Sequence, residues 1–538
     1  MYLHELYITQ WNSLQAPTQY QGSGSSHELA ALLVTEVIQH SKAQKLPLFL
    51  LFLDARSAFD TVVTEYLVRY LYLSGVEGDA LLFLNHRLKH RKTYVDWDKT
   101  LMGPMLDENG VEQGGINSSD FYKLYNNDQL TSAQASCLGV DMGNSVVVGA
   151  IGQADDVILA SNDIDSLRLL VTLTEKYCAK FRVKLVPSKT KLLAYSTESQ
   201  RHVVEHAELI NQISIGGEPV KFVTEAEHVG VIRNIDGNLP NIMHRITAHK
   251  RSMGAVLSAG LARGQRGNPA ASLKVHQLYG SPVLFSGLAT LVLSPAEVKI
   301  IDHHYQHTVQ NVQRLHDKTP RSLVLLMAGS LPGEAILNLK QLTLFLMICH
   351  LPEDPLNTHA RSVLISASST ARSWFLQIRQ LCLMYHLDHP LHLLHNPPAK
   401  TVFKRLAKQA VCDYWENTLK EEASNLPSLH LFVASNCSLQ STHPIWTAAG
   451  SNSYECHKST VLARMVSGRY RTDYLARHWT SNKNGFCILN TCHEVVGDLK
   501  HMLILCPGLS QVRTRMRQMF LSRQAAEDFP AQAELFPD

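Results

Sequence analysis

The sequence has no apolar run of the roughly 20 residues that a helix needs to cross a bilayer. Its longest apolar stretches, Leu46–Leu53 and Pro282–Leu293, are short or are interrupted by Gly and Ser. The first residues, MYLHELYITQW, also lack the basic segment and the following apolar segment that mark a secretion signal. We therefore expect an intracellular protein of the nucleus or the cytoplasm that is not secreted and has no membrane partner.

The chain also has little excess of one sign of charge over the other. The 538 residues include 50 Lys and Arg against 47 Asp and Glu, which gives a formal net charge of only +3. Nucleic-acid-binding domains usually carry a larger basic excess, so any contact with RNA or DNA must come from basic residues gathered in one groove. The content of 45% hydrophobic and 18% charged residues is that of a globular chain. A chain of this length is too long to fold around one compact core, so we expect several domains.

Disulfides are not expected, because they form and persist in secreted proteins. Most of the 10 cysteines are scattered singly, but near the end of the chain four residues separate Cys487 from Cys492, and four separate His501 from Cys506. Four such ligands in one short segment predict a structural Zn²⁺ site of tetrahedral geometry. His493 is a less suitable ligand because it directly follows Cys492. The alternative is a set of unligated thiols in a helical domain.

Two predicted strands end in acidic residues. Leu46–Leu53 (LPLFLLFL) is continuously apolar, as a buried central strand is, and Asp54 follows it directly. Val146–Ala150 is rich in β-branched residues and leads through a tight turn into Val157–Ala160. This pattern predicts a hairpin that carries the acidic pair Asp155-Asp156 at its tip.

Carboxylates at neighbouring strand ends repel one another. Two like charges about 4 Å apart cost roughly 4 kcal/mol at an effective dielectric constant of about 20. Such a cluster is stable when a proton or a divalent cation neutralises it, and Mg²⁺ prefers carboxylate, water and phosphate oxygens. The alternative is that Asp155 and Asp156 only form a turn and that Asp54 only caps the next helix.

Five segments, in the order in which they occur along the chain, resemble motifs A to E of the reverse transcriptases of non-LTR (LINE-type) retrotransposons. They are Leu51–Asp60 (LFLDARSAFD), Gly110–Gly115 (GVEQGG), Ala154–Asp156 (ADD), Ser188–Lys191 (SKTK) and His228–Val231 (HVGV). Farther along, Tyr279–Leu284 and Gly329–Pro332 resemble stretches downstream of the palm in these elements. The resemblance implies an RNA-directed DNA polymerase with an α+β right-hand palm, partial fingers and a mainly helical thumb and C-terminal region.

The resemblance also implies the chemistry of the acidic cluster. Asp54, Asp155 and Asp156 would bind two Mg²⁺ ions that serve the transfer of a nucleotide to a primer 3′-hydroxyl. Lys189 of motif D would protonate the departing pyrophosphate. The alternative for Lys189 is an ordinary solvated side chain after a Pro-Ser turn.

Three further residues would bind nucleotides, according to the same resemblance. Phe59 would clash with a ribose 2′-hydroxyl, which disfavours a polymerase that copies RNA into RNA, and Gln113 with Gly114 would support the template and the incoming nucleotide. The implied partners are an RNA template, a DNA primer or target and dNTPs, while the oligomeric state stays open. The alternatives are that Phe59 is a core aromatic and that Gln113 closes a Gly-rich turn.

Two segments depart from the family pattern. Gln153 stands where the family usually has an aromatic residue. Thr18–Ser26 resembles a fingers motif but lacks the Arg or Lys expected to bind a triphosphate. Motif A begins only about 50 residues into the chain, so we expect an N-terminally truncated protein without an endonuclease. The alternative function is that of a weakly active or inactive retroelement fragment that only binds nucleic acid.

These patterns predict six consecutive regions. They are a partial fingers remnant (1–45), the palm (46–235), a thumb and its connection (240–330), a helical C-terminal region (331–450), a domain with the Cys-Cys-His-Cys zinc knuckle (455–524) and a disordered tail (525–538). Basic residues that could contact nucleic acid occur at Arg245–Arg251 in the thumb. Basic and aromatic residues mix at Gly468–Arg471 and Arg477–Trp479. The alternative for all three stretches is a solvated helix face.

Overall fold

The computed structural model describes most of the chain. The described residues are 18–19, 27–115, 117–195, 213–256, 267–352, 355–368, 372–429, 431–450, 452–470, 472, 485–489, 492 and 495–524. The predicted tail at 525–538 and the stretch Arg477–Trp479 lie outside these residues.

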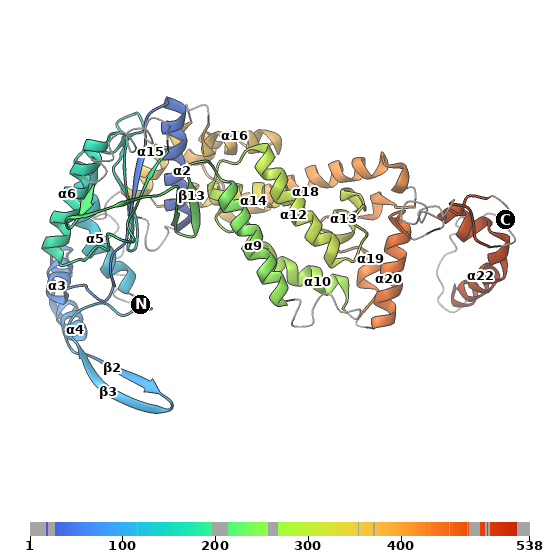
Figure 1. The fold of residues 1–538 in the computed structure, drawn as a ribbon, viewed down its shortest axis with the longest axis horizontal. Helices are drawn as coiled ribbons and strands as arrows, with labels where there is room; N and C mark the ends of the chain where they lie inside the picture. The colour runs from blue at the N-terminus through green and yellow to red at the C-terminus, as the bar shows by residue number, and fades with distance from the viewer. Residues whose placement is uncertain are drawn as a thin grey trace. The chain divides into compact units, whose positions relative to one another are not determined.

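The chain forms two compact units, each made of segments that are far apart in the sequence. The first unit consists of Met1–Arg251, Ser281–Asp302 and Gly333–Asp413. The second consists of Ser252–Gly280, His303–Pro332 and Tyr414–Asp538. In Figure 1 the elements are coloured by their position in the chain, from blue at the N-terminus to red at the C-terminus.

The first unit has mixed α and β structure, as the sequence predicts. Its strands are β1 (Phe49–Leu53), β2 (Arg91–Trp97), β3 (Thr100–Asp107), β4 (Val140–Asp141), β5 (Val147–Val148), β6 (Ala150–Gln153), β7 (Asp156–Ser161), β8 (Lys191–Ala194), β9 (Ser214–Ile215), β10 (Glu218–Pro219), β11 (Lys221–Phe222), β12 (Glu225–His228) and β13 (Val231–Asn234). Its helices are α2 (His27–Gln44), α3 (Thr64–Leu73), α4 (Gly78–Lys89), α5 (Ser118–Ala135), α6 (Ile164–Phe181), α11 (Ser281–Phe285), η3 (Leu288–Thr290), α14 (Gly333–Cys349), α15 (Pro355–Ala367), α16 (Trp374–Met384) and α17 (Pro390–His395).

A five-stranded sheet with the strand order β11-β8-β1-β7-β6 lies at the centre of the first unit. The central strand, β1, pairs antiparallel with both β7 and β8. All five of its residues, Phe49–Leu53, are buried. Such a strand has no polar face, which explains why its sequence is a continuous apolar run rather than an alternating one.

Helices α5 and α6 pack on the sheet through their apolar residues. Leu130 of α5 and Leu167 and Leu170 of α6 join Leu51 and Leu159 of the sheet in one buried cluster. The helix α6 begins where the Asp163 carboxylate accepts a hydrogen bond from the Ser166 amide at 2.8 Å. This N-cap satisfies a backbone donor that the helix itself leaves unpaired.

The helix α2 is buried over most of its surface and contacts helices from the far end of the first unit, α15 and α16. The Phe375 amide of α16 donates a hydrogen bond to Glu36 of α2 at 3.1 Å. In the same helix, the fully buried Trp374 donates its indole N–H to the Ala289 carbonyl at 2.6 Å. Residues 333–413 therefore belong to the same core as the sheet.

The second unit is helical among its described residues. Its elements are α10 (Pro269–Val275), the π-helix η2 (His276–Gly280), α13 (Arg321–Ala328), η4 (Pro427–Leu429), η5 (Ala434–Asn436), α19 (Pro444–Thr447), α20 (Ser453–Val466), the π-helix η6 (His501–Leu505), η7 (Pro507–Leu509) and α22 (Ser510–Gln524). Three helices, α9 (Leu239–Val256), α12 (Pro295–Val312) and α18 (Lys400–Ser424), continue from one unit into the other. Trp446, which has no exposed surface, donates its indole N–H to Gln313 at 2.9 Å and anchors α19 in this core.

No individual helix among the described residues has both the length and the apolar composition to span a bilayer. In the described part of the chain, the broken pair Arg321–Ala328 and Gly333–Cys349 meets that test of length and composition when its two helices are counted together.

Candidate active site

The register between β1 and β7 determines where two of the predicted acids lie. Leu53 pairs with Val157 in this antiparallel ladder. Asp54 follows Leu53 and Asp156 precedes Val157, so the two acids come opposite each other at the end of the pairing. Residues directly opposite in such a ladder have Cβ atoms about 4.5–5.5 Å apart. The sheet therefore brings together two acids that are separated by about 100 residues of sequence.

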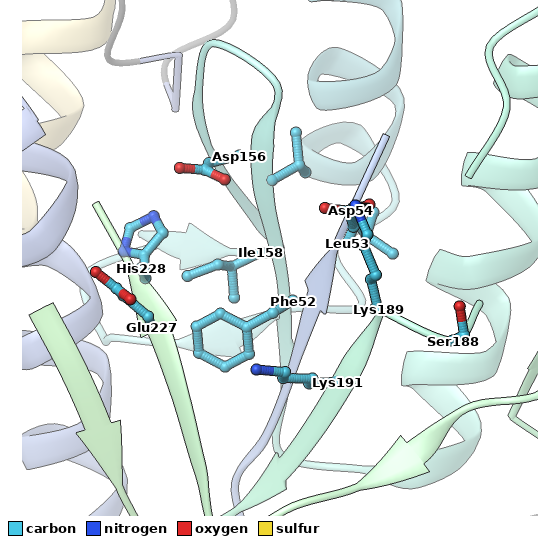
Figure 2. A pocket seen from close by; sticks show the side chains of 11 residues that line it. Phe52, Leu53, Asp54, Asp156, Ile158, Ser188, Lys189, Lys191, Glu227 and His228 are labelled. Carbon is cyan, nitrogen blue, oxygen red and sulfur yellow. Dashed lines mark ion pairs between the residues drawn. The ribbon is translucent and has the colours of Figure 1, made fainter. Parts of the chain in front are cut away.

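A cleft of about 340 Å³ opens at this end of the sheet (Figure 2). It is lined by Phe52, Leu53, Asp54, Asp156, Val157, Ile158, Ser188, Lys189, Lys191, Glu227 and His228. The lining combines β1, β7, the start of β8 and β12, so four segments that are distant in sequence contribute side chains. Its charged groups are acids and lysines, which suits a polar substrate and a cation.

Asp155 lies on the tip of the hairpin and does not line the cleft. Gln153 pairs with Asp156, which leaves a two-residue turn of Ala154 and Asp155. Ala154 has a φ of +58°, in the left-handed region that residues with a side chain rarely adopt. The Asn126 side-chain amide of α5 donates to the Ala154 carbonyl at 3.4 Å and helps to hold this turn.

The acids influence one another. Partial burial raises the pKa of Asp156 to about 6, and the negative charges of Asp155, Asp54 and Glu227 contribute to the rise. Each neighbouring carboxylate makes it more costly to ionise the next one. The cluster therefore favours positive charge at this position, which either a proton or a cation can supply.

Lys189 reaches one of these acids, Asp54, from the loop before β8. Its Nζ lies 3.7 Å from Asp54 Oδ2, and both side chains are partly exposed to solvent. The loop is held in place because the Val186 amide donates to the Asp54 carbonyl at 2.8 Å and the Asp54 amide donates to Thr190 Oγ1 at 3.4 Å. An exposed ion pair of this kind contributes little to stability, so the amine remains available to a substrate.

The Phe59 side chain is held in place by an aromatic contact. Its ring stacks on that of Tyr122 in α5, with ring centroids 4.7 Å apart and planes inclined by 18°. The Val111 amide donates to the Phe59 carbonyl at 2.8 Å, which joins the loop after Asp54 to the loop that contains Gln113 and Gly114. Gln113 is exposed and Gly114 has a φ of +84°, so the glycine permits a turn that other residues disfavour.

Glu227 lines the cleft, although the sequence did not single it out. The strand β12 alternates, with Glu227 exposed and His228 buried. Burial lowers the pKa of His228 to about 3, with a further contribution from the charge of Arg233, so the ring is neutral. The alternation of acidic and apolar positions in EAEH indicates that Glu225 and Glu227 share the exposed face, but only the fold shows that this face borders the acids.

The segment that resembles a fingers motif begins beside the hairpin. The Gly152 amide of β6 donates to the Thr18 carbonyl at 2.9 Å, and Gln19 forms a parallel bridge with Gly152. A Cβ at Gly152 would come within 2.8 Å of the Leu130 side chain, so the glycine permits the close approach of α5 to β6. Residues 20–26 of this segment are not among the described residues.

The basic stretch of α9 is less available than the sequence suggests. Arg245 is half-buried and its guanidinium donates to the Gly230 carbonyl, while His249 is buried. Lys250 and Arg251 are exposed. Only the last two residues of this stretch therefore present their charge to solvent.

A second cluster lies near the C-terminus, in the second unit. One ligand atom from each of Cys487, Cys492, His501 and Cys506 lies within 4.8 Å of all the others. The Sγ atom of Cys506 is 3.9 Å from that of Cys487 and 3.5 Å from that of Cys492. A tetrahedron with Zn–S bonds of about 2.3 Å would hold its sulfur atoms roughly 3.8 Å apart. The donor set and the spacing both fit zinc.

The sequence of the first unit matches a known family. Residues 9–223 match the family model described as reverse transcriptase (RNA-dependent DNA polymerase). Over 155 residues the chain is 26% identical to the retrovirus-related Pol polyprotein from the type-1 retrotransposable element R2 of Popillia japonica. This match covers 28% of the chain and 25% of the relative, so the chain spans about a quarter of the length of the curated relative it matches.

A solved structure is also similar to the chain. It is apo telomerase from Candida tropicalis, with a TM-score of 0.34 and 11% sequence identity over 76% of this chain and 60% of that one.

The family match and the geometry concern the same part of the molecule. The matched range contains both β1 and β7, whose ends carry Asp54 and Asp156. The chain therefore carries a reverse transcriptase domain. The match to the polyprotein of a non-LTR retrotransposon supports a domain of the non-LTR type, as the motifs predicted.

Proposed function

We propose that this protein is an RNA-directed DNA polymerase that extends the 3′-end of a primer with dNTPs along an RNA template. The observation that carries the proposal is the meeting of Asp54 and Asp156 at one cleft, inside a domain that matches the reverse transcriptase family. The lysine ion pair at Asp54 and the aromatic stack at Phe59 support the same reading.

The acids Asp54, Asp155 and Asp156 would hold two Mg²⁺ ions. Carboxylate oxygens are the donors that Mg²⁺ prefers, and the raised pKa of Asp156 supports a site that requires a cation at neutral pH. When bound, the two ions would activate the primer hydroxyl and stabilise the leaving pyrophosphate.

The remaining residues would orient the substrates and move a proton. Lys189 Nζ would donate a proton to the departing pyrophosphate. The Phe59 ring, braced by Tyr122, would exclude a ribose 2′-hydroxyl, and the exposed Gln113 with Gly114 would support the template base and the incoming nucleotide.

Zinc would have a structural role at the second cluster. Cys487, Cys492, His501 and Cys506 would form a closed tetrahedral site, which leaves no open position for substrate chemistry. Folding of the short segments around them would then depend on the metal.

Primer extension on an RNA template with Mg²⁺ and dNTPs tests the polymerase proposal. We expect the native chain to extend the primer and Asp156→Asn to lose at least about a hundredfold in rate, because the loss of electrostatic stabilisation at a reacting group costs that much. The control is Asp60→Asn, which removes an exposed acid of the same loop that does not line the cleft. It should keep the native rate.

Two outcomes would contradict the proposal. A native chain that binds the RNA–primer duplex without extending it would indicate a fragment that only binds nucleic acid. Equal rates for the native chain and Asp156→Asn would show that primer extension does not depend on the acids of the cleft.

A further inference from the structure

The hairpin of β2 and β3 leaves the end of α4 and extends away from the central sheet (Figure 1). Its two strands form a sheet of their own, and no other strand in the described part of the chain pairs with either of them. Apart from Arg91 and Asp107 at its base, every residue of both strands is exposed. An isolated two-stranded hairpin is marginally stable in water, so this one lacks the support that other strands of the unit receive.

Large apolar side chains occupy both faces of the hairpin. The exposed ones are Tyr94, Val95, Trp97, Leu101, Met102, Met105 and Leu106, and Trp97 shows 72% of its surface. Exposed apolar surface gathered on one element marks a site of interaction. The hairpin therefore has the composition of a surface that a partner covers.

The charges of the hairpin favour a protein partner over a nucleic acid. Residues 91–107 contain three basic and three acidic residues, Arg91, Lys92, Lys99, Asp96, Asp98 and Asp107. A surface that binds the phosphate backbone needs an excess of basic residues, which this segment does not have.

The two edges of the hairpin differ in their ability to pair with another strand. In β3, Pro104 has no N–H to donate, and proline and irregularities are common ways to block an edge. In β2, residues Arg91–Trp97 include no proline and no glycine. The register of the hairpin shifts at Tyr94, which faces both Gly103 and Pro104, so the extra residue of this irregularity belongs to β3. The free edge of β2 is therefore the one suited to accept a further strand.

We propose that β2 pairs antiparallel with β2 of a second copy of this chain, with Tyr94 on the two-fold axis. The two hairpins then form one four-stranded sheet in the order β3-β2-β2-β3. Such an edge-to-edge contact joins two identical surfaces and closes at a dimer.

The sequence of β2 is complementary to itself in this register. Each Lys92 comes opposite Asp96 of the second copy, so the dimer contains this ion pair twice. Arg91 comes opposite Trp97, an arrangement that favours a cation–π contact, and the two Tyr94 rings meet at the axis. Opposite charges and aromatic pairs directly across a ladder are the contacts that stabilise antiparallel strands.

Other registers lose this match. A shift of the centre to Thr93 places Lys92 opposite Tyr94 and uses only five residues of each strand. A shift to Val95 brings Asp96 opposite Tyr94 and Arg91 opposite the like-charged turn residue Lys99. It pairs Lys92 only with Asp98, which lies in the turn and outside the strand. The register centred on Tyr94 is the one that uses all seven residues of Arg91–Trp97 and pairs every charge within them.

Sedimentation analysis of the full chain across a range of concentrations tests the proposal, with a charge exchange as the specific probe. We expect a concentration-dependent dimer. Lys92→Glu alone and Asp96→Lys alone should each weaken it about tenfold, because each creates two like-charged pairs. The double variant Lys92→Glu/Asp96→Lys should return the dissociation constant to within about threefold of the native value, since it restores both pairs in reverse.

Lys99→Glu is the matched control. It makes the same charge change in the same hairpin, but Lys99 lies in the turn and outside the paired residues, so dimerisation should not change. Equal thermal unfolding midpoints for all four variants would show that their folds are intact.

Two results would overturn the proposal. One is a single monomeric species at every concentration. The other is a dimer that the double variant fails to restore. If Lys92→Glu and Lys99→Glu also reduced RNA affinity equally in a monomeric protein, the hairpin would be a nucleic-acid surface. The measurement needs no nucleotide or primer, so its outcome is independent of the polymerase proposal.

Discussion

Glu36 is an ionisable side chain in an apolar position. It lies in the middle of α2 with no exposed surface, and one carboxyl oxygen accepts the Phe375 amide at 3.1 Å. Burial raises the pKa of Glu36 to about 8, although backbone hydrogen bonds from Phe375 and Trp374 oppose the rise. The side chain is therefore protonated in the folded protein at neutral pH.

This protonation makes stability depend on pH. The folded pKa lies above the unfolded value of 4.5, so the folded state binds the proton more tightly. The contribution is fully present below about pH 4.5 and is lost as the pH rises through 8. Each pKa unit corresponds to about 1.4 kcal/mol.

We expect Glu36→Gln to remove this loss, because the amide keeps the shape of the protonated acid and cannot ionise. The free energy of unfolding of the variant, relative to that of the native chain, should increase between pH 5 and pH 9 by an amount on the order of a few kcal/mol. Urea denaturation at several pH values measures it. The exposed Glu65→Gln in α3 is the control, and parallel pH profiles for the native chain and Glu36→Gln would contradict the prediction.

At the scale of elements, the sequence predicts local structure well and long-range register poorly. The apolar run Leu46–Leu53, predicted as a buried strand, contains β1. The hairpin with two acids at its tip is also present. These elements are predictable because periodicity and turn residues act over a few positions.

The composition of the site depends on contacts that local patterns do not contain. A shift of one residue between β1 and β7 would send Asp54 and Asp156 to opposite faces of the sheet, and no local signal fixes that register. The resemblance of motifs predicted the three aspartates of the site. It did not predict Glu227, whose position follows from the packing of β12. The burial of Glu36 depends on α16, more than 300 residues later in the chain.

The four residues of the C-terminal cluster permit a prediction about one short segment. We expect the purified full chain to contain about one equivalent of zinc, and Cys506→Ser to lose most of it, because three remaining ligands do not close a tetrahedral site. Atomic emission measures the metal. Cys137→Ser, which changes an exposed thiol elsewhere in the chain, should retain the zinc.

A zinc content that does not differ between Cys506→Ser and Cys137→Ser would contradict the assignment. The cluster would then consist of free thiols, and the described segment around His501 would owe its fold to packing alone.

At the scale of the whole molecule, each compact unit is assembled from three stretches of chain. The first unit depends on Gly333–Asp413, since α15 and α16 contact α2 and since Trp374 reaches the Ala289 carbonyl. The part of the chain that matches the reverse transcriptase family, residues 9–223, is therefore only a portion of the core in which its sheet is buried.

We expect Trp374→Ala to destabilise the first unit by about 3–5 kcal/mol, because it leaves a large cavity and removes a buried hydrogen bond. Hydrogen exchange of the α2 amides, which should become faster, locates the effect in the predicted core. Leu383→Ala is the control, since Leu383 lies in the same helix but shows 78% of its surface. Unchanged exchange in α2 would argue against this packing.

The interleaving of the two units has a consequence for biosynthesis. The helix α16, which covers part of α2, is made more than 300 positions after it. This separation corresponds to roughly 20–70 s at translation rates of about 5–20 residues per second. During that interval β6 can already pack on α2, but the part of the helix that α16 covers stays open to other contacts. A ribosome that stalls before α16 would leave a polypeptide whose sheet domain is complete in sequence but lacks part of its core.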